Sequence, residues 1–415
     1  MKRARDVDAA ASSSASEAPA RKGSPNAAPL RATEHISFRM GDHDAFSPEF
    51  AHNLFEQDLL PSSRAPPAPC VVVDGRSLAL TLDDAAPVYG PLERHLARAM
   101  AYGPAEAVHH DSREPLVGGY TVHRSPLETA ADVAFHRRAE ALAPFFIETA
   151  DAVDLDDPCW EAYYAYAPTG EFCGYTTVYR FRNPVRGVVL RVCQMLVLPT
   201  HQRRGIGGAL FARVFSDARA DPKACEVTVE DPCPGFSAMR LAHDLADVAR
   251  HAAAALGLPA PGAAAATFAA LAPAAAAAAA ASRKMTAAQL TRCREAAFVA
   301  AAAADGDQAA VRLAVKRRLL REHREDIDAC RDKLARQQHL NGLWRQECAR
   351  YVRALRAAGK RGAPVGAPPA WADAIEKEVR DEVEAEEAEA DAVEARERAA
   401  LWAQLRRAEE ENLSV

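Results

Sequence analysis

The chain has 415 residues, a formal net charge of −6, and a composition of 49% hydrophobic and 26% charged residues. This length allows two or three domains, and the negative charge argues against a general nucleic-acid-binding protein while permitting basic partners. The nine cysteines include no Cys-x-x-Cys pair, which argues against a disulfide framework or a zinc site and is typical of reduced thiols in a cytosolic or nuclear protein.

The amino-terminal segment, residues 1–33, is rich in Ser, Ala, Pro and charged residues, and we expect it to be disordered. It lacks the apolar stretch of a secretory signal. Two basic clusters, Lys2–Arg5 and Arg21-Lys22, fit a weak nuclear import signal, although such clusters are commoner as ordinary parts of charged tails.

Short strand-like runs follow between turns that contain Pro and Gly, at Cys70–Val73 and Leu78–Leu82. Leu127–Thr149 carries apolar residues at helical spacing. These patterns predict an amino-terminal α/β domain over residues 34–150.

A dense section of β-type sequence begins at Trp160 and then alternates with helical patterns. The expected elements are a hairpin of Trp160–Ala167 and Phe172–Phe181, a strand Val188–Leu198, a helix Gly205–Ala218, a strand Cys225–Val229 and a helix Ser237–Leu256. This order is typical of an α/β cofactor domain, which we place at residues 151–257.

The stretch Leu256–Ala281 carries no charge and is long enough to cross a bilayer. Its alanines are only weakly apolar and several prolines interrupt it, so we expect residues 258–283 to be an Ala/Pro-rich linker. Beyond it we expect a helical domain at 284–358 and a second linker with an acidic helix at 359–415. The expected helices are Thr286–Ala301, Gln308–Gln337, Leu340–Ala357 and Trp371–Glu411.

The segment Gln202–Gly208 lies between a predicted strand and a predicted helix. A helix start exposes unpaired N–H groups and the positive end of the helix dipole, so it favours phosphate groups. Glycines 205, 207 and 208 allow close approach, and Arg203 and Arg204 add positive charge. The order Q-x-x-G-x-G-G departs from the dinucleotide fingerprint G-x-G-x-x-G. The glycines alone are equally consistent with a purely structural helix start.

This loop resembles the Q/R-x-x-G-x-G/A loop that holds the pyrophosphate of acetyl-CoA in the GNAT superfamily of N-acetyltransferases. Further motifs resemble the type B histone acetyltransferase catalytic subunit in order and approximate spacing. They are Phe46–Phe55, Ile147–Ala150, Asp154–Trp160, Gly174–Tyr179, Gln194–Leu198, Glu230–Pro232 and Arg312–Leu319. The resemblance covers about residues 35–355. It implies an α+β fold in which an acetyl-CoA-binding GNAT domain carries an amino-terminal α/β domain and a carboxy-terminal helical extension.

Acetylation of lysine requires a base, because an amine with a pKa of about 10.4 is only about one-thousandth neutral near pH 7.4. The resemblance implies that Glu230, directly after the strand Cys225–Val229, is this base. The alternative is an ordinary surface carboxylate at a strand end. Asp231 and Glu148 are acidic neighbours in the family's site and are candidates for binding the lysine or relaying the proton.

The resemblance also implies cofactor and substrate contacts. The expected cofactor residues are Met195, Leu196 and Val197 at the pantetheine, Gln202, Arg203, Arg204, Gly205, Ile206, Gly207 and Gly208 at the pyrophosphate, and Phe236 and Arg240 near the coenzyme. The expected substrate residues are Trp160, Tyr179, Arg180, Phe181, Gln57, Asp58 and Leu59. Arg180 is unusual against a basic peptide, which favours an orientation away from it. Cys233 stands where the family has Ser or Asn, and a thiol is a poor hydrogen-bonding group for a coenzyme contact.

By resemblance, the chain transfers acetyl from acetyl-CoA to lysine side chains of newly synthesised free histones, on the amino-terminal tail of histone four and with histone three as a further partner, before chromatin assembly. The resemblance further implies a WD-repeat histone chaperone as partner, a place in nucleus and cytoplasm, no metal, no membrane contact and no direct nucleic-acid contact. Two alternatives are a non-catalytic histone-binding module with the same fold and an acetyltransferase for protein amino termini or small amines. The acidic helix is either a solvated charged helix or an additional arm that holds histones.

Overall fold

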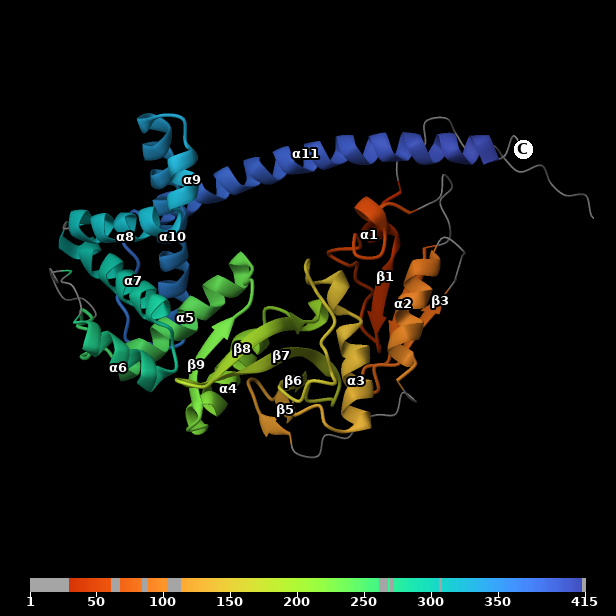
Figure 1. The fold of residues 1–415 in the computed structure, drawn as a ribbon, viewed down its shortest axis with the longest axis horizontal. Coiled ribbons are helices and arrows are strands. Elements are labelled where there is room, and N and C mark those ends of the chain that lie inside the picture. The colour runs from red at the N-terminus through yellow and green to blue at the C-terminus, as the bar shows by residue number, and fades with distance from the viewer. Residues whose placement is uncertain are drawn as a thin grey trace, which may run out of the picture.

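The computed structural model describes residues 30–60, 68–83, 89–102, 113–260, 268, 272–305 and 308–412. Residues 1–29 of the expected disordered tail lie outside this part of the chain. Packing begins by Leu30, whose carbonyl accepts a hydrogen bond from the Leu60 N–H at 3.0 Å, and Ala32 is fully buried. The described protein has a central sheet, with a smaller sheet at one end and a helical bundle at the other (Figure 1).

The central sheet has six strands in the order β4-β5-β6-β7-β8-β9. Their bounds are β4 Glu114–Pro115, β5 Thr121–Ser125, β6 Trp160–Tyr166, β7 Phe172–Asn183, β8 Gly187–Val197 and β9 Ala224–Val229. Neighbours are antiparallel from β4 to β8, which confirms the predicted β6–β7 hairpin, whereas β8 and β9 are parallel. A parallel pair needs a crossover connection, and helix α4 (Ile206–Ala220) supplies it.

Both faces of the central sheet are covered by apolar side chains. On one face α4 and α5 (Pro234–His251) bury Phe211 and Leu241 against the strands. On the other face α3 (Ala130–Glu140) contributes Phe135, whose ring meets Tyr164 of β6 at a centroid distance of 5.1 Å. The short helix η3 (Ala143–Phe145) follows α3 in the same core. The sheet therefore separates two hydrophobic cores.

The amino-terminal part packs into the core behind α3. It consists of α1 (Ala32–His35), β1 (Ser37–Met40), η1 (Glu56–Asp58), β2 (Cys70–Val73), β3 (Leu80–Asp83) and α2 (Gly90–Met100). Its three strands form a small sheet in which β1 is parallel and β3 antiparallel to the middle strand β2.

The carboxy-terminal part is helical, as the sequence predicts. The helices are α6 Pro273–Arg283, α7 Ala287–Asp305, α8 Gln308–Glu322, α9 Arg324–Ala329, α10 Lys333–Lys360 and α11 Ala372–Asn412. Helix α10 packs along α5 and against α7, so the bundle joins the core on the α4–α5 face of the central sheet. Helix α11 begins beside α10 and then extends from the bundle as a long rod (Figure 1).

Two predictions for the carboxy-terminal half differ from the structure. Residues 273–283, expected to belong to a linker, form helix α6, because alanine is the strongest helix former and Pro273 occupies the first turn, where its missing N–H costs nothing. The helix expected over Gln308–Gln337 is divided into α8, α9 and the start of α10, and the break expected near residues 337–340 is absent. Helix α10 begins at Lys333, where the side chain of Asp332 accepts a hydrogen bond from the Ala335 N–H at 2.8 Å. No helix in the described residues is long and apolar enough to cross a membrane.

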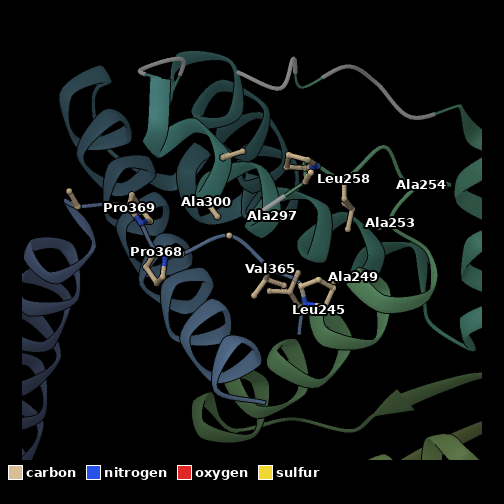
Figure 2. A pocket seen from close by; sticks show the side chains of 17 residues that line it. Leu245, Ala249, Ala253, Ala254, Leu258, Ala297, Ala300, Val365, Pro368 and Pro369 are labelled. Carbon is tan, nitrogen blue, oxygen red and sulfur yellow. The ribbon is translucent and has the colours of Figure 1, made fainter. Parts of the chain in front are cut away.

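A cavity of about 540 Å³ opens between the end of α5, helix α7 and the Pro-rich segment 364–370 (Figure 2). Its walls are mostly alanine and proline, with Leu245, Leu258 and Val365 among the larger side chains. None of the residues expected to carry chemistry lines it.

Candidate active site

Glu230 lies directly after the last residue of β9. Its backbone N–H donates to the carbonyl of Val192 at 2.9 Å, which holds it beside the neighbouring strand β8. The carboxylate lies at a shallow pocket of about 240 Å³, lined by Trp160, Tyr179, Phe181, Arg191, Cys193 and Glu230 itself. The side chain is 47% exposed, so it is accessible from solvent. The structure thus brings together the expected base and three of the expected substrate residues.

Aromatic rings form the wall of this pocket. The Trp160 and Tyr179 ring centroids are 4.9 Å apart, and those of Tyr179 and Phe181 are 4.5 Å apart, both edge-on. The Tyr179 hydroxyl donates to Asp157 Oδ2 at 2.8 Å, and this bond raises the tyrosine's pKa to about 12. The backbone N–H of Cys159 and the Tyr179 hydroxyl together lower the pKa of Asp157. A rigid aromatic wall of this kind suits the methylene stem of a lysine side chain.

Arg191 and Cys193 complete the pocket and were not predicted from the sequence. The Arg191 guanidinium lies 3.7 Å from Glu230 Oε1 and 4.3 Å from the Phe181 ring centroid. Burial, followed by a hydrogen bond to Glu230 and the charge of that carboxylate, raises the pKa of Cys193 to about 12, so its thiol stays protonated near neutral pH. The sequence carries part of the signal, because strand alternation places residues 191 and 193 on the same face of a strand, whereas the register that pairs Arg191 with Tyr179 is seen only in the structure.

The sheet opens beside the pocket. Strands β8 and β9 pair only as far as Val192 and Val229, so the backbone of Met195–Val197 has no partner on β9. On the other side, β7 approaches β8 very closely at Gly174, where a Cβ would lie 2.2 Å from the Leu196 carbonyl oxygen. Only glycine permits this approach. The backbone edge of Met195–Val197 that β9 leaves unpaired is where a pantetheine arm could pair.

The predicted phosphate loop begins at η4 (Pro199–His201) and runs into α4. Gln202 Nε2 donates to the Val197 carbonyl at 3.0 Å, which ties the loop to β8. Gly205 is the N-cap residue with φ +82°, and no side chain caps the helix. The first intrahelical bond is donated by Ala209, so the N–H groups of Ile206–Gly208 are available to an anion. Nothing lies within 4 Å of a Cβ placed on Gly205, so the loop fits a closely approaching pyrophosphate.

The two arginines of the loop differ in their surroundings. Arg204 donates to the Tyr120 hydroxyl at 3.0 Å, and this hydroxyl lies 3.3 Å from His201 Nδ1, so Arg204 also anchors the loop. Arg203 has φ +61° and is exposed. Burial, followed by the charges of His43 and Arg204, lowers the pKa of His201 and keeps its ring neutral in this anchor.

Helix α5 uses two of the residues in question for its own structure. Arg240 is buried, donating to the Val227 carbonyl at 3.0 Å and to Asp244 Oδ2 at 3.3 Å, which binds α5 to β9. Cys233 Sγ accepts a hydrogen bond from the Phe236 N–H at 3.5 Å as the N-cap of α5. The thiol thus serves as a helix cap, and a coenzyme contact by Arg240 stays a prediction.

The remaining acidic candidates are exposed. Asp231 follows Glu230 with φ +33°, and Glu148 lies on the surface after η3, where its carbonyl accepts a bond from Asn53 at 3.4 Å. The lining of the Glu230 pocket includes neither residue. Their catalytic roles stay predictions.

Four expected substrate residues lie away from the pocket. Arg180 points to the opposite face of β7 and pairs with Asp221 Oδ2 at 2.5 Å. This orientation suits a basic peptide substrate, because it keeps the positive charge of Arg180 out of the pocket. Asp58 is buried and accepts bonds from Arg31 Nε at 3.0 Å and the Thr33 N–H at 2.8 Å. Leu59 is also buried, so of the three expected residues Gln57, Asp58 and Leu59 only Gln57 is exposed to solvent.

Comparison with known proteins identifies the central segment. Residues 128–243 match the model of the Acetyltransferase (GNAT) family. The histone acetyltransferase type B catalytic subunit of Yarrowia lipolytica is 33% identical over 149 residues, covering 30% of this chain and 33% of that protein. The protein of the same name from Mycosarcoma maydis is 32% identical over 139 residues, covering 32% of this chain and 31% of that protein. The match spans about a third of the length of these relatives.

Among solved structures, an aminoglycoside acetyltransferase from an uncultured soil metagenomic sample aligns with a TM-score of 0.22 and 21% identity, covering 28% of this chain and 82% of that chain. An overlap this weak carries no argument about substrate. The resemblance to type B histone acetyltransferase catalytic subunits that the motifs indicated is confirmed over the matched segment.

Proposed function

Because residues 128–243 match the Acetyltransferase (GNAT) family, we propose that the chain is an acetyl-CoA-dependent acetyltransferase whose substrates are lysine side chains of histones. The observation that carries the proposal is the position of Glu230. Its carboxylate lies at an aromatic pocket of about 240 Å³, next to the edge of β8 that β9 leaves unpaired. A carboxylate in that position can receive a proton from an amine directed at a thioester on β8.

In the proposed reaction the lysine nitrogen attacks the thioester carbonyl carbon of acetyl-CoA. Glu230 accepts the proton that the amine loses, the carbon–sulfur bond breaks, and coenzyme A leaves as a thiolate that is then protonated. Trp160, Tyr179 and Phe181 cover the lysine methylenes and direct the amine toward Glu230. The backbone of Met195–Val197 and the first turn of α4 hold the coenzyme.

The similarity to histone acetyltransferase type B catalytic subunits supports histones as the substrate class. Within that class we propose the amino-terminal tail of histone four on newly synthesised free histones, with histone three as a further partner. Acetylation before chromatin assembly, a WD-repeat histone chaperone, and activity in nucleus and cytoplasm belong to the same proposal. Two alternatives differ from this proposal. An acetyltransferase for amino termini or small amines would have the same cofactor loop but would modify other acceptors, and a histone-binding module would bind histones without transferring acetyl groups.

The test is transfer of labelled acetyl from acetyl-CoA to free core histones, polyamines and unrelated amino-terminal peptides. We expect label on histone four, and a loss of about a hundredfold or more in Glu230→Gln. Glu226→Gln on the same strand is the matched control, because its carboxylate pairs with Arg186 at 2.7 Å, outside the pocket, and should leave the rate unchanged.

Each other outcome has a defined meaning. Histone labelling that survives Glu230→Gln would move the base to Glu148 or Asp231, which Glu148→Gln and Asp231→Asn would then separate. Label only on small amines or amino termini would refute the histone substrate. Histone binding without any turnover would refute the enzyme and favour the binding module.

A further inference from the structure

A guanidinium from the carboxy-terminal bundle lies against the phosphate loop. Arg361 is the C-cap residue of α10, and a Cβ placed on Gly208 would lie 2.9 Å from its terminal nitrogen Nη2 and 3.7 Å from its Cζ. Gly208 is in the first turn of α4, one residue after Gly207, whose own Cβ would lie 3.6 Å from Met239 Sδ of α5 and 3.7 Å from the Val197 side chain on β8. The guanidinium therefore adjoins the same helix turn that the coenzyme phosphates would meet.

The position of Arg361 is held through its backbone, which leaves the side chain available. Its N–H donates to the Ala358 carbonyl at 3.1 Å, and its own carbonyl accepts a bond from Arg250 Nη2 of α5 at 2.8 Å. Within the described residues no carboxylate lies within ion-pair distance of the guanidinium, which is exposed. By contrast, the nearby Arg356 of α10 is paired with Glu376 and Asp373.

We propose that Arg361 binds a phosphate group of coenzyme A, so that the end of α10 forms one wall of the coenzyme site. This inference rests on the proposed function and adds a ligand that lies beyond the region of family resemblance, about residues 35–355. The chemistry is simple: a planar guanidinium and the free N–H groups of Ile206–Gly208 would meet the same anion from two sides. The shared ligand chemistry is a phosphate monoester or diester, and coenzyme A offers both.

The experiment measures binding of coenzyme A and of 3′-dephospho-coenzyme A to the full chain by titration calorimetry at low salt. We expect Arg361→Ala to weaken coenzyme A binding about tenfold, which corresponds to about 1.4 kcal/mol, and Arg361→Lys to fall between. Lys360→Ala is the matched control, since it removes the same charge from an exposed neighbouring residue and should leave affinity unchanged.

The two ligands identify the phosphate. A tenfold loss that persists with 3′-dephospho-coenzyme A assigns Arg361 to the pyrophosphate, and a loss seen only with coenzyme A assigns it to the 3′-phosphate. Both outcomes support the inference. Equal affinity of the wild type, Arg361→Ala and Lys360→Ala overturns it, as does an equal loss in both variants, which would reflect general charge.

A second variant keeps the test valid if Arg361→Ala fails to fold. Gly208→Ala places a methyl group where the guanidinium lies, and the flexible arginine must move away. We expect Gly208→Ala to weaken coenzyme A binding in the wild-type background. In the Arg361→Lys background we expect it to cause little further loss of affinity, since the contact between residue 361 and the phosphate is already impaired there. Equal effects in both backgrounds overturn the inference. No binding of coenzyme A by the wild type would instead refute the proposed function itself.

Discussion

The buried imidazole of His136 should make the protein less stable in mild acid. His136 lies in α3 with no exposed surface, its Nδ1 is 3.1 Å from the Tyr164 hydroxyl, and its Nε2 has no hydrogen-bond partner among the described atoms. Burial, followed by the charge of Arg137, lowers the pKa of His136 to about 3. In the unfolded chain a histidine has a pKa of about 6.5.

The sign and size of the effect follow from these two pKa values. Below pH 6.5 the unfolded chain takes up a proton that the folded chain refuses, so stability falls as the pH falls toward 3. Between pH 7 and pH 5 this one group removes about 2 kcal/mol from the free energy of unfolding. Any folded-state pKa below about 4 gives nearly the same figure.

The assay is urea unfolding of the wild type and of His136→Gln at pH 7 and pH 5. Glutamine retains an amide for the Tyr164 hydroxyl and cannot titrate in this range. We expect the wild type to lose about 2 kcal/mol more than the variant between the two pH values.

Glu140 provides the competing explanation. Its Oε1 is 3.9 Å from His136 Nε2, a distance at which a charged pair could form. We favour the neutral ring, because burial raises the pKa of Glu140 and its two oxygens already accept bonds from the Val153 N–H at 2.6 Å and Arg137 at 2.8 Å. If the folded protein held a protonated His136 against Glu140, the wild type would gain stability relative to the variant on acidification, and the reasoning would fail.

Two further predictions concern the site. Gly174→Ala should destabilise the fold by about 1–3 kcal/mol in urea unfolding and abolish coenzyme A binding, because its Cβ would collide with the Leu196 carbonyl. The control is Gly342→Ala in α10, where nothing lies within 4 Å of the added Cβ, and this variant should stabilise the fold by about 0.5–1 kcal/mol. Equal effects of the two substitutions would contradict the steric argument. Phe181→Ala should raise the KM for a lysine peptide about fivefold in steady-state assays while leaving coenzyme A affinity unchanged, since about 1 kcal/mol of lysine stem contact is lost; an unchanged KM would place the lysine elsewhere.

The parts of the site that the sequence predicted depend on local patterns. The uncapped start of α4 after Gly205 and the carboxylate after β9 follow from strand, loop and helix signals within a few residues. The pocket wall was only partly predictable. Arg191 lies in the pocket wall because the register of β7 and β8 places it opposite Tyr179. That register depends on the bulge near Thr176 and Val178, which composition does not reveal.

Contacts between distant segments were beyond local patterns. The contact of Arg361 with Gly208 depends on how α10 packs on α5. No local sequence pattern around either residue predicts that the two lie close together. Helix α6 differs from the prediction for another reason: the prolines of the same stretch indicate a linker, whereas the high helix propensity of the alanines favours a helix.

The buried charges of the bundle explain how α10 can place a residue at the phosphate loop. Arg318 of α8 is 6% exposed and lies 2.9 Å from Glu295 of α7 and 2.6 Å from Glu347 of α10, while its Nη2 also donates to the Tyr351 hydroxyl at 2.9 Å. Removing one member of such a buried cluster leaves an uncompensated charge and costs about 3–5 kcal/mol, so alternative registers of the three helices are disfavoured. The basic run Arg312–Leu319, which composition alone could assign to an anionic partner, therefore contributes a residue to the interior. Its effect is to hold α10 against α7 and α8, while α10 also packs along α5 and Arg361 at its end lies beside Gly208.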